Sequence, residues 1–468
     1  MLLYQKITER LKDKIREGVY RPGDRLPSLR EASQSLGVSL TTMYHAYNVL
    51  ESHGFIRARP QSGYTVREQT YAGAEAYPPR QPLSWLPGVD MDAVATQVLS
   101  SLDGPGIVPF GAAYLDRDLL PLEQLLGYMR DVTRRPPPHA ADPAGAMDLR
   151  REIAKRYLLL GYDVALEDIV VTSGVIDAVN LALSTLLRPG DRVAVADASF
   201  FAVSFSLHRF GLVPYPIPTT AHGGIDLGAL AHALGSGAVK ACLLMTNCHN
   251  PLGFSLDSEQ KAELVALLAT HQVPLIDNDV YGELHFSPTH NPSAKAFDKE
   301  GWVLHCGSFS NTLAPEMRVG WIAAGRFRDR LLSVKFLSSM SVPGAIHQAI
   351  AEYLRHENFD RHLRRLRREL CARVEEGFRH IDAWGPLVQA RSAPAGGFMV
   401  WLALPPQVDS LALYQQALQA GLTFVPGALF SVDRVRTNEI ALNFSFPWND
   451  QNIAALGELH RLIRTAVS

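Results

Sequence analysis

The sequence predicts an α/β protein in two parts: a small helical head that ends in two short strands, and a larger body in which helices and strands alternate. Three observations indicate this organisation. The chain has 468 residues, more than one ordinary domain requires. Its composition, 47% hydrophobic and 20% charged, is typical of a globular protein with a sizeable core. Helical periodicity dominates the first part, whereas short apolar runs and helical patterns alternate from residue 149 onward.

The head is expected to span residues 1–68. Apolar residues recur every four positions in its first segment, serines stand where they cap the next two helices, and Gly37 ends the second helix. A turn rich in Pro, Ser and Gly separates two short runs that predict a hairpin. The predicted helices cover 4–17, 28–36 and 39–53, and the predicted strands cover 55–59 and 64–66. Three helices followed by such a wing form a winged helix-turn-helix, whose third helix enters the major groove of DNA.

Three segments of the head resemble the GntR family. They are Pro22-Gly23-Asp24-Arg25-Leu26-Pro27-Ser28-Leu29-Arg30, Leu36-Gly37-Val38-Ser39 and Leu50-Glu51-Ser52-His53-Gly54-Phe55-Ile56. The resemblance implies DNA contacts from the second helix, the recognition helix and the wing, by Arg30, Ser39, Thr41, Thr42, Tyr44, His45, Arg57, Arg59 and Gly63. Two alternatives stay open: Ser39 is only a helix cap, and Tyr44 and His45 pack against the wing. Leu40 departs from the family, in which arginine is common at that position.

The charge distribution gives weak support to a DNA-binding head. Residues 1–68 carry 11 Lys and Arg against 7 Asp and Glu, so the head has a charge of +4 although the whole chain has −2. Many small domains reach such a value by chance. A second basic run, from Arg361 to Arg368, places arginines on several faces of a helix. A solvated face is its expected role, and DNA contact is the alternative.

Sequence signals for secretion, membranes and metals are absent. The four cysteines show no C-x-x-C spacing, so we expect the protein to lie in a reducing cytoplasm. The 16 histidines show no ligand spacing, so we expect no metal site. The first ten residues already carry charge, and no uninterrupted apolar stretch is long enough to cross a bilayer. Neither a signal peptide nor membrane contact is expected.

The body is expected to follow a linker over residues 69–105, which contains Pro and Gly clusters and one short helix near residues 91–102. Apolar runs at 169–171, 192–195, 241–245, 273–276 and 302–304 are typical of strands in a parallel sheet covered on both faces. We expect a body over 106–468, with a large α/β lobe at about 150–342 and a small α+β lobe formed by 343–468 together with 106–149.

Several motifs of the body resemble the fold-type I aminotransferases, which use pyridoxal phosphate (PLP). They are Asp142-Pro143-Ala144-Gly145, Thr172-Ser173-Gly174-Val175, His249-Asn250-Pro251-Leu252-Gly253 and the segment from Ser308 to Trp321. The fusion of such a body, here about residues 107–468, to a GntR head is characteristic of the MocR class of bacterial regulators. The resemblance therefore implies a bacterial transcriptional regulator with an aminotransferase-like body.

The resemblance implies a phosphate cup and a ring site. Ser173, Gly174 and Val175 follow a strand and open a helix, where backbone N–H groups hold phosphates, and Ser308, Ser310 and Arg318 complete the cup at the family spacing. Phe200 matches the aromatic residue over the pyridine ring, although a core phenylalanine is an equal alternative. Asn250 and Tyr281 match the residues that hydrogen-bond to the ring hydroxyl.

Three positions depart from the catalytic pattern. Asn311 stands at the position of the cofactor-binding lysine, and an amide cannot condense with an aldehyde. Asn278 stands at the position of the aspartate that pairs with the pyridinium nitrogen, with Asp279 as the alternative partner should the register differ by one residue. Ala441 replaces the arginine that grips the substrate carboxylate. No residue is therefore expected to be catalytic.

The functional expectation is a cytoplasmic, homodimeric regulator that binds a double-stranded DNA operator and a small-molecule effector. It would hold no covalent cofactor, but could accept PLP or another phosphorylated ligand noncovalently. The alternative is a PLP-dependent regulator or aminotransferase in which Asn311 is an engineered replacement of lysine. A body that binds no ligand and acts only as a scaffold is a third reading.

Overall fold

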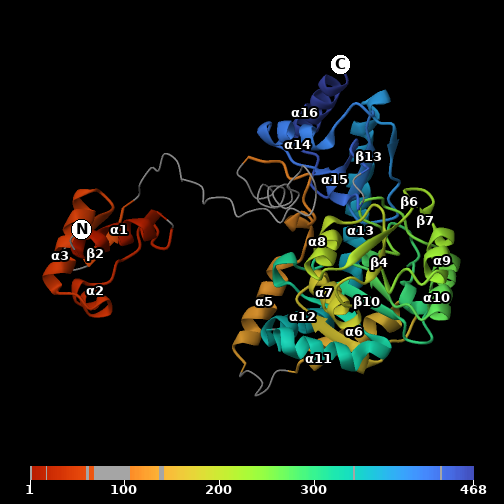
Figure 1. Ribbon diagram of the computed structural model, residues 1–468, viewed down its shortest axis with the longest axis horizontal. Coiled ribbons are helices and arrows are strands. Elements are labelled where there is room, and N and C mark those ends of the chain that lie inside the picture. The colour runs from red at the N-terminus through yellow and green to blue at the C-terminus, as the bar shows by residue number, and fades with distance from the viewer. Residues whose placement is uncertain are drawn as a thin grey trace. The chain divides into compact units, whose positions relative to one another are not determined.

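The computed structural model describes residues 3–16, 18–59, 63–67, 106–135, 142–340, 343–432 and 435–468. The predicted linker, including its short helix, lies outside the described residues. The chain divides into two compact units, the head and the body, which are coloured red and orange to blue in Figure 1. Each unit is described by itself.

The head has the predicted helices and wing, α1 (Leu3–Arg16), α2 (Leu29–Leu36), α3 (Leu40–Ser52), β1 (Ile56–Arg59) and β2 (Gly63–Val66). Ser28 and Glu31 form a reciprocal capping box at the start of α2, and Gly37 ends that helix in the left-handed conformation at φ 64°. The Ser39 hydroxyl accepts a hydrogen bond from the Thr42 N–H at 3.1 Å and caps α3. These local signals explain why the boundaries of the head helices are readable from the sequence.

A sheet of seven strands organises the described part of the body, in the order β3-β11-β10-β9-β8-β4-β5. Its strands are β3 (Ile169–Thr172), β4 (Arg192–Ala196), β5 (Val213–Ile217), β8 (Ala241–Leu244), β9 (Leu275–Asn278), β10 (Val303–Ser308) and β11 (Gly320–Ala323). A short hairpin, β6 (Thr219–Thr220) with β7 (Gly224–Ile225), follows β5.

Both faces of this sheet are buried, as the near-continuous apolar runs predict. Val193 and Val195 of β4 pack against α7 (Val175–Leu186) and α11 (Arg328–Ser339) in one core cluster. Ala194, between them, points into a second cluster with α9 (Leu227–Gly235) and α10 (Ser258–His271). The alternation follows from the two-residue period of a strand, and helices on both sides cover the sheet (Figure 1).

Strand β11 differs from the expected all-parallel arrangement. It lies antiparallel between β3 and β10, whereas β10, β9, β8, β4 and β5 pair in parallel. No strand was expected at Gly320, because this residue and Trp321 belong to the segment from Ser308 to Trp321 that resembles the cofactor loop. In register, Gly320 lies opposite both Thr172 of β3 and Ser308 of β10.

A long helix, α13 (Phe359–Asp382), connects the cores of the body. Phe359 and Leu363 in its first turns pack with the outer strands β3 and β11, while Leu370 and Val374 pack in the cluster of the small lobe. At 24 residues it is about 36 Å long.

The small lobe has the antiparallel sheet β12-β13-β15-β14, with β12 (Ala390–Arg391), β13 (Met399–Ala403), β14 (Val425–Pro426) and β15 (Glu439–Asn443).

The remaining described α-helices are α5 (Leu122–Thr133), α6 (Met147–Leu159), α8 (Phe201–Arg209), α12 (Gly344–His356), α14 (Ser410–Gln419), α15 (Gly427–Phe430) and α16 (Asp450–Val467). Helices α5, α6 and α12 share a buried cluster with β3 and β11. In the part of the chain that the structure describes, no helix combines the length and the apolar character that a membrane crossing requires.

Gly320 is a sensitive packing position. A Cβ atom there would lie 2.6 Å from the backbone carbon of Gly174 and 2.8 Å from the carbonyl oxygen of Gly307, and neither backbone atom can turn aside. We expect Gly320→Ala to lower the free energy of unfolding by about 1–3 kcal/mol, measured by chemical denaturation. Gly127→Ala in α5 is the matched control, because nothing lies within 4 Å of its added Cβ. The control should gain about 0.5–1 kcal/mol from helix propensity, and an equal response of both variants would contradict the packing argument.

Candidate functional site

The predicted pocket residues follow the carboxyl ends of neighbouring strands in the body. Ser173 follows β3, Phe200 follows β4, Asn250 follows β8, Asn278 ends β9 and Asn311 follows β10. Open α/β sheets bind their ligands at this edge, because the loops after parallel strands gather there. The topology thus gathers at one edge residues that lie up to 138 positions apart in the sequence.

The phosphate-cup candidates Ser173, Gly174 and Arg318 lie close together, because Arg318 comes just before β11 and β11 pairs with β3. The guanidinium of Arg318 lies beside Gly174, since a Cβ there would be 2.7 Å from Nη2, and Nη2 is 3.5 Å from the carbonyl oxygen of Ser173. Gly174 has φ 94° and opens α7, with Val175 as the first helical residue. The Asp177 carboxylate accepts the Ser173 N–H at 2.8 Å. An incoming phosphate would therefore compete with Asp177 for that donor.

The loop after β10 supplies hydroxyl groups beside the asparagine. Ser308 Oγ donates to Ser310 Oγ at 3.0 Å and lies 3.1 Å from the Val319 carbonyl oxygen, while the Ser310 N–H donates to Ser308 Oγ at 3.1 Å. Asn311 is buried, with 6% of its surface exposed. Among the described residues its amide has no hydrogen-bond partner, so it is available to a ligand.

A small cavity of about 10 Å³ lies at the end of β9 and is called the ring cavity here. Asn278, Phe200, Ser199 and His249 are among its lining residues. Asn278 Oδ1 is buried and has no hydrogen-bond partner in the described structure. Burial and, to a lesser extent, the charge of Arg436 lower the pKa of His249 to about 3, so its ring is neutral. A ring ligand would thus meet uncharged groups at this wall.

Asp279, unlike Asn278, is not among the lining residues of the ring cavity. Its carboxylate accepts from His305 Nε2 at 3.0 Å, His305 Nδ1 lies 2.7 Å from the Tyr157 hydroxyl, and Trp321 Nε1 donates to that hydroxyl at 2.8 Å. Burial raises the pKa of Asp279, but the hydrogen bond and charge of His305 outweigh it, so the net direction is down. Asp277 shares this face, because strand residues two apart point the same way.

Asn250 and Tyr281 are brought together as the resemblance implies. Both are buried, and Asn250 Nδ2 lies 3.4 Å from the Tyr281 hydroxyl. Burial raises the pKa of Tyr281, so it stays a neutral donor.

A second cavity of about 10 Å³, the apolar cavity, adjoins the ring cavity through Phe200. It contains Ala441, and its other lining residues are Ala113, Phe200, Phe201, Asn250, Pro251, Met399, Val425 and Phe430. Sequence reasoning did not find most of these residues, since isolated apolar side chains carry no motif. His249 could have been found, because it directly precedes Asn250.

The head exposes most of the predicted DNA-contacting side chains. Arg30, Ser39, Thr41, Tyr44, His45, Arg57 and Gly63 are exposed and Thr42 is half-buried, while Arg59 lies on β1. The His45 ring lies 5.9 Å from that of Tyr4 and 6.2 Å from that of Tyr44. Tyr47 packs against the wing: its ring meets Tyr64 at 4.9 Å and 81°, and its hydroxyl donates to the Pro27 carbonyl oxygen.

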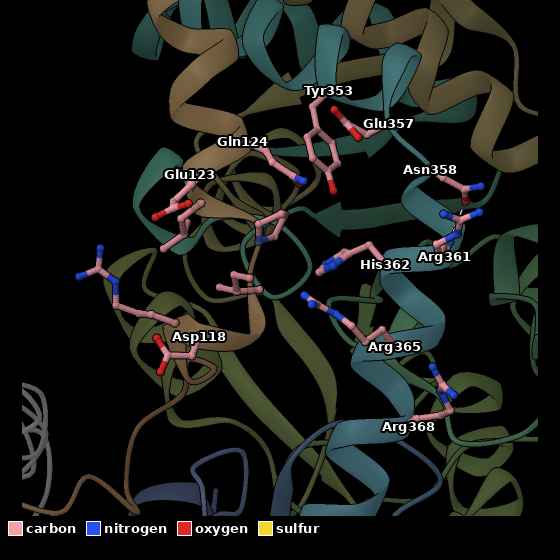
Figure 2. A pocket seen from close by; sticks show the side chains of 14 residues that line it. Asp118, Glu123, Gln124, Tyr353, Glu357, Asn358, Arg361, His362, Arg365 and Arg368 are labelled. Carbon is pink, nitrogen blue, oxygen red and sulfur yellow. Dashed lines mark hydrogen bonds between the residues drawn. The ribbon is translucent and has the colours of Figure 1, made fainter.

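A larger groove of about 930 Å³ lies beside the first half of α13, and Figure 2 shows the side chains that line it. Arg361, Arg365 and Arg368 of α13 point into it, across from Asp118 and Glu123. Within the described ranges these three guanidinium groups have no ion pair. None of the predicted pocket residues lines this groove.

Both parts of the chain match known family models. Residues 3–66 match the bacterial regulatory proteins of the gntR family, and residues 139–445 match aminotransferase class I and II. Solved structures share the fold of the body. The match to a multiple substrate aminotransferase from Thermococcus profundus covers 81% of this chain and 99% of that protein, with a TM-score of 0.73 and 21% identity. An archaeal alanine:glyoxylate aminotransferase gives a TM-score of 0.75 with 24% identity, covering 81% of this chain and 96% of its own.

Curated relatives match over the full length. The uncharacterized HTH-type transcriptional regulator YdcR of Escherichia coli K12 is 37% identical, with 99% of each chain covered. YjiR, a second such regulator of the same strain, is 31% identical with 100% of each chain covered. The chain combines a GntR helix-turn-helix domain with an aminotransferase class I and II domain, and these relatives share its full length. It therefore belongs to the MocR-type family of DNA-binding transcriptional regulators.

Proposed function

We propose that this regulator uses its aminotransferase-like body to bind a small phosphorylated ligand noncovalently and to form a dimer, and that it does not catalyse amino-group transfer. One observation carries the proposal: the three positions that provide chemistry in the resembling enzymes hold Asn311, Asn278 and Ala441, while the candidate phosphate and hydroxyl contacts are retained. The pocket thus keeps groups that bind and lacks groups that react.

The missing lysine has no substitute in the described pocket. Lys261 Nζ donates to Asn247 Oδ1 at 2.6 Å and to the Pro292 carbonyl oxygen, and Lys335 Nζ donates to the Pro143 carbonyl oxygen. Neither lysine lines the ring cavity or the apolar cavity. Without an amine, no covalent bond to an aldehyde can form at this place.

PLP fits the residues present as a noncovalent ligand. Ser173, Ser308 and Arg318 would hold its phosphate, because a dianion needs hydroxyl donors and a guanidinium. Asn250 and Tyr281 would hydrogen-bond to its ring hydroxyl, and the buried Asn278 amide would face its ring nitrogen. When bound to an enzyme, PLP supplies an electron-withdrawing ring. Asn278 is neutral and would not hold that nitrogen protonated.

The head supports operator binding by two copies. A winged helix-turn-helix reads one half-site, and a dimer brings a second copy to the other half-site. The exposed Arg30 on α2 supports a phosphate contact. We place this activity in the bacterial cytoplasm, where the operator lies.

Arg30→Ala is expected to weaken operator binding and to lower the slope of log affinity against log salt by about one, as loss of one phosphate contact does. Fluorescence anisotropy with a labelled duplex over a salt series measures both. Arg461→Ala is the charge-matched control, since Arg461 pairs with Glu458 on α16. An unchanged slope for Arg30→Ala would rule out the assigned phosphate contact.

Arg318→Ala should weaken PLP binding, because a charge-assisted contact to phosphate contributes about 1.5–3 kcal/mol, or about 10-fold to 150-fold in affinity. Isothermal titration calorimetry with PLP and with inorganic phosphate measures the change. Arg330→Ala, at an exposed arginine of α11, is the control. Absence of PLP binding at millimolar concentration, or binding that Arg318→Ala leaves intact, would remove the proposed ligand site.

Asn311→Lys alone should restore a covalent PLP adduct without useful turnover of amino acids. The adduct would be detected as a visible absorbance band and, after borohydride reduction, as a mass increase of the chain. Turnover should stay absent, because Asn278 leaves the ring nitrogen unprotonated and Ala441 leaves the substrate carboxylate without its guanidinium.

The triple variant Asn311→Lys, Asn278→Asp, Ala441→Arg is the informative comparison, since groups that act as a unit do not add simply. Efficient turnover by the single variant would show that the body is one substitution away from an enzyme, against the proposed function.

A further inference from the structure

The apolar cavity marks the place where the resembling enzymes hold the substrate carboxylate. Ala441 lies on β15 opposite Trp401 of β13 and Val425 of β14. Asn443, two residues on and therefore on the same face, donates to the carbonyl oxygens of Ala112 and Tyr114 at 2.8 Å each. These bonds hold the backbone on both sides of Ala113 at the cavity.

The lining of this cavity is unsuited to an anion. Eight of its nine residues are apolar, and Asn250 is the exception. An unpaired carboxylate in such surroundings is strongly disfavoured, because it loses its hydration and finds no cation. An uncharged alkyl group would instead gain from leaving water.

The arginines of the adjoining segments are already paired. Arg436 Nη2 donates to Asp197 Oδ1, three residues before Phe200, and Arg436 Nη1 lies 3.1 Å from Glu439. Arg373 Nη1 donates to Asp116 Oδ2, three residues after Ala113, at 2.8 Å. His249 is neutral at the neighbouring wall. No cation among the cavity's lining residues therefore replaces the arginine missing at Ala441.

We propose that the body selects ligands whose side arm is uncharged and apolar, and discriminates against amino-acid adducts. The inference rests on the proposed function, because it takes the phosphate and ring contacts as given. The ligand class is then a phosphorylated pyridine-type ring whose alkyl or other neutral arm packs against the residues that line the apolar cavity, which has to open to take it because its volume is about 10 Å³. A free or ring-linked α-carboxylate would lie against Ala113, Met399 and Ala441.

The test uses the full chain and two compounds that differ in one group. They are N-(5′-phosphopyridoxyl)-L-leucine and N-(5′-phosphopyridoxyl)-3-methylbutylamine, which lacks only the carboxylate. Neither needs a lysine for binding. We expect the decarboxylated compound to bind at least about tenfold more tightly by isothermal titration calorimetry, since burying an unpaired charge is costly.

Equal affinities, or tighter binding of the leucine compound, would overturn the inference while leaving the proposed function intact. If neither compound, nor PLP, nor inorganic phosphate binds at millimolar concentration, the proposed function fails and this inference fails with it. The unaltered protein decides between these outcomes, so the test does not depend on a variant that folds.

A variant sharpens the assignment to Ala441. Ala441→Arg should reverse the preference toward the leucine compound by restoring a bidentate cation. Gln451→Arg adds the same charge at an exposed position of α16 and should leave the preference unchanged. Reversal by both variants would assign the effect to net charge and would contradict the role of the cavity. A thermal melt confirms that each variant is folded.

Discussion

The close approach of β11 to β3 and β10 is the constraint on which the pocket depends. Gly320 stands opposite Thr172 on one side and Ser308 on the other, and its missing side chain lets the backbone of Gly174 come near. This contact brings together a helix N-terminus from one segment with a pair of hydroxyls and a guanidinium from another, the segment Ser308 to Trp321. Their convergence is a property of the sheet, so it persists whether or not the neighbouring residues can react.

Much of this arrangement can be read from the sequence, for physical reasons that differ between regions. Ser28, Gly37 and Ser39 set helix ends through local hydrogen bonds and backbone conformation, so the head is predictable residue by residue. The buried strands of the body are predictable because both faces are apolar. β11 was not predicted, because its first residues belong to the segment that resembles the cofactor loop and one of its two partners, β3, lies far away in the sequence.

In the pocket, too, some residues can be predicted from the sequence and others cannot. Asn278 lines the ring cavity, whereas its neighbour Asp279 is engaged by His305, as the alternation of side chains along a strand leads one to expect. The apolar cavity escaped prediction, since Ala113, Met399 and Phe430 come from distant segments and have ordinary core residue types. Likewise, the contact of Tyr47 with Tyr64 of the wing depends on which face of α3 the hairpin covers.

Helix α13 contacts the loop after β10 and also lines the large groove that contains its arginines. His362 Nε2 lies 2.7 Å from the carbonyl oxygen of Thr312, the residue after Asn311, and His362 also lines the large arginine-bearing groove. One hydrogen bond therefore separates the loop that would cradle a ligand from a helix whose outer face carries three unpaired guanidinium groups (Figure 2). Arg361 and Arg365 lie within one helical turn of His362, so a ligand that contacted Asn311 would lie close in the chain and in the hydrogen-bond network to this basic surface.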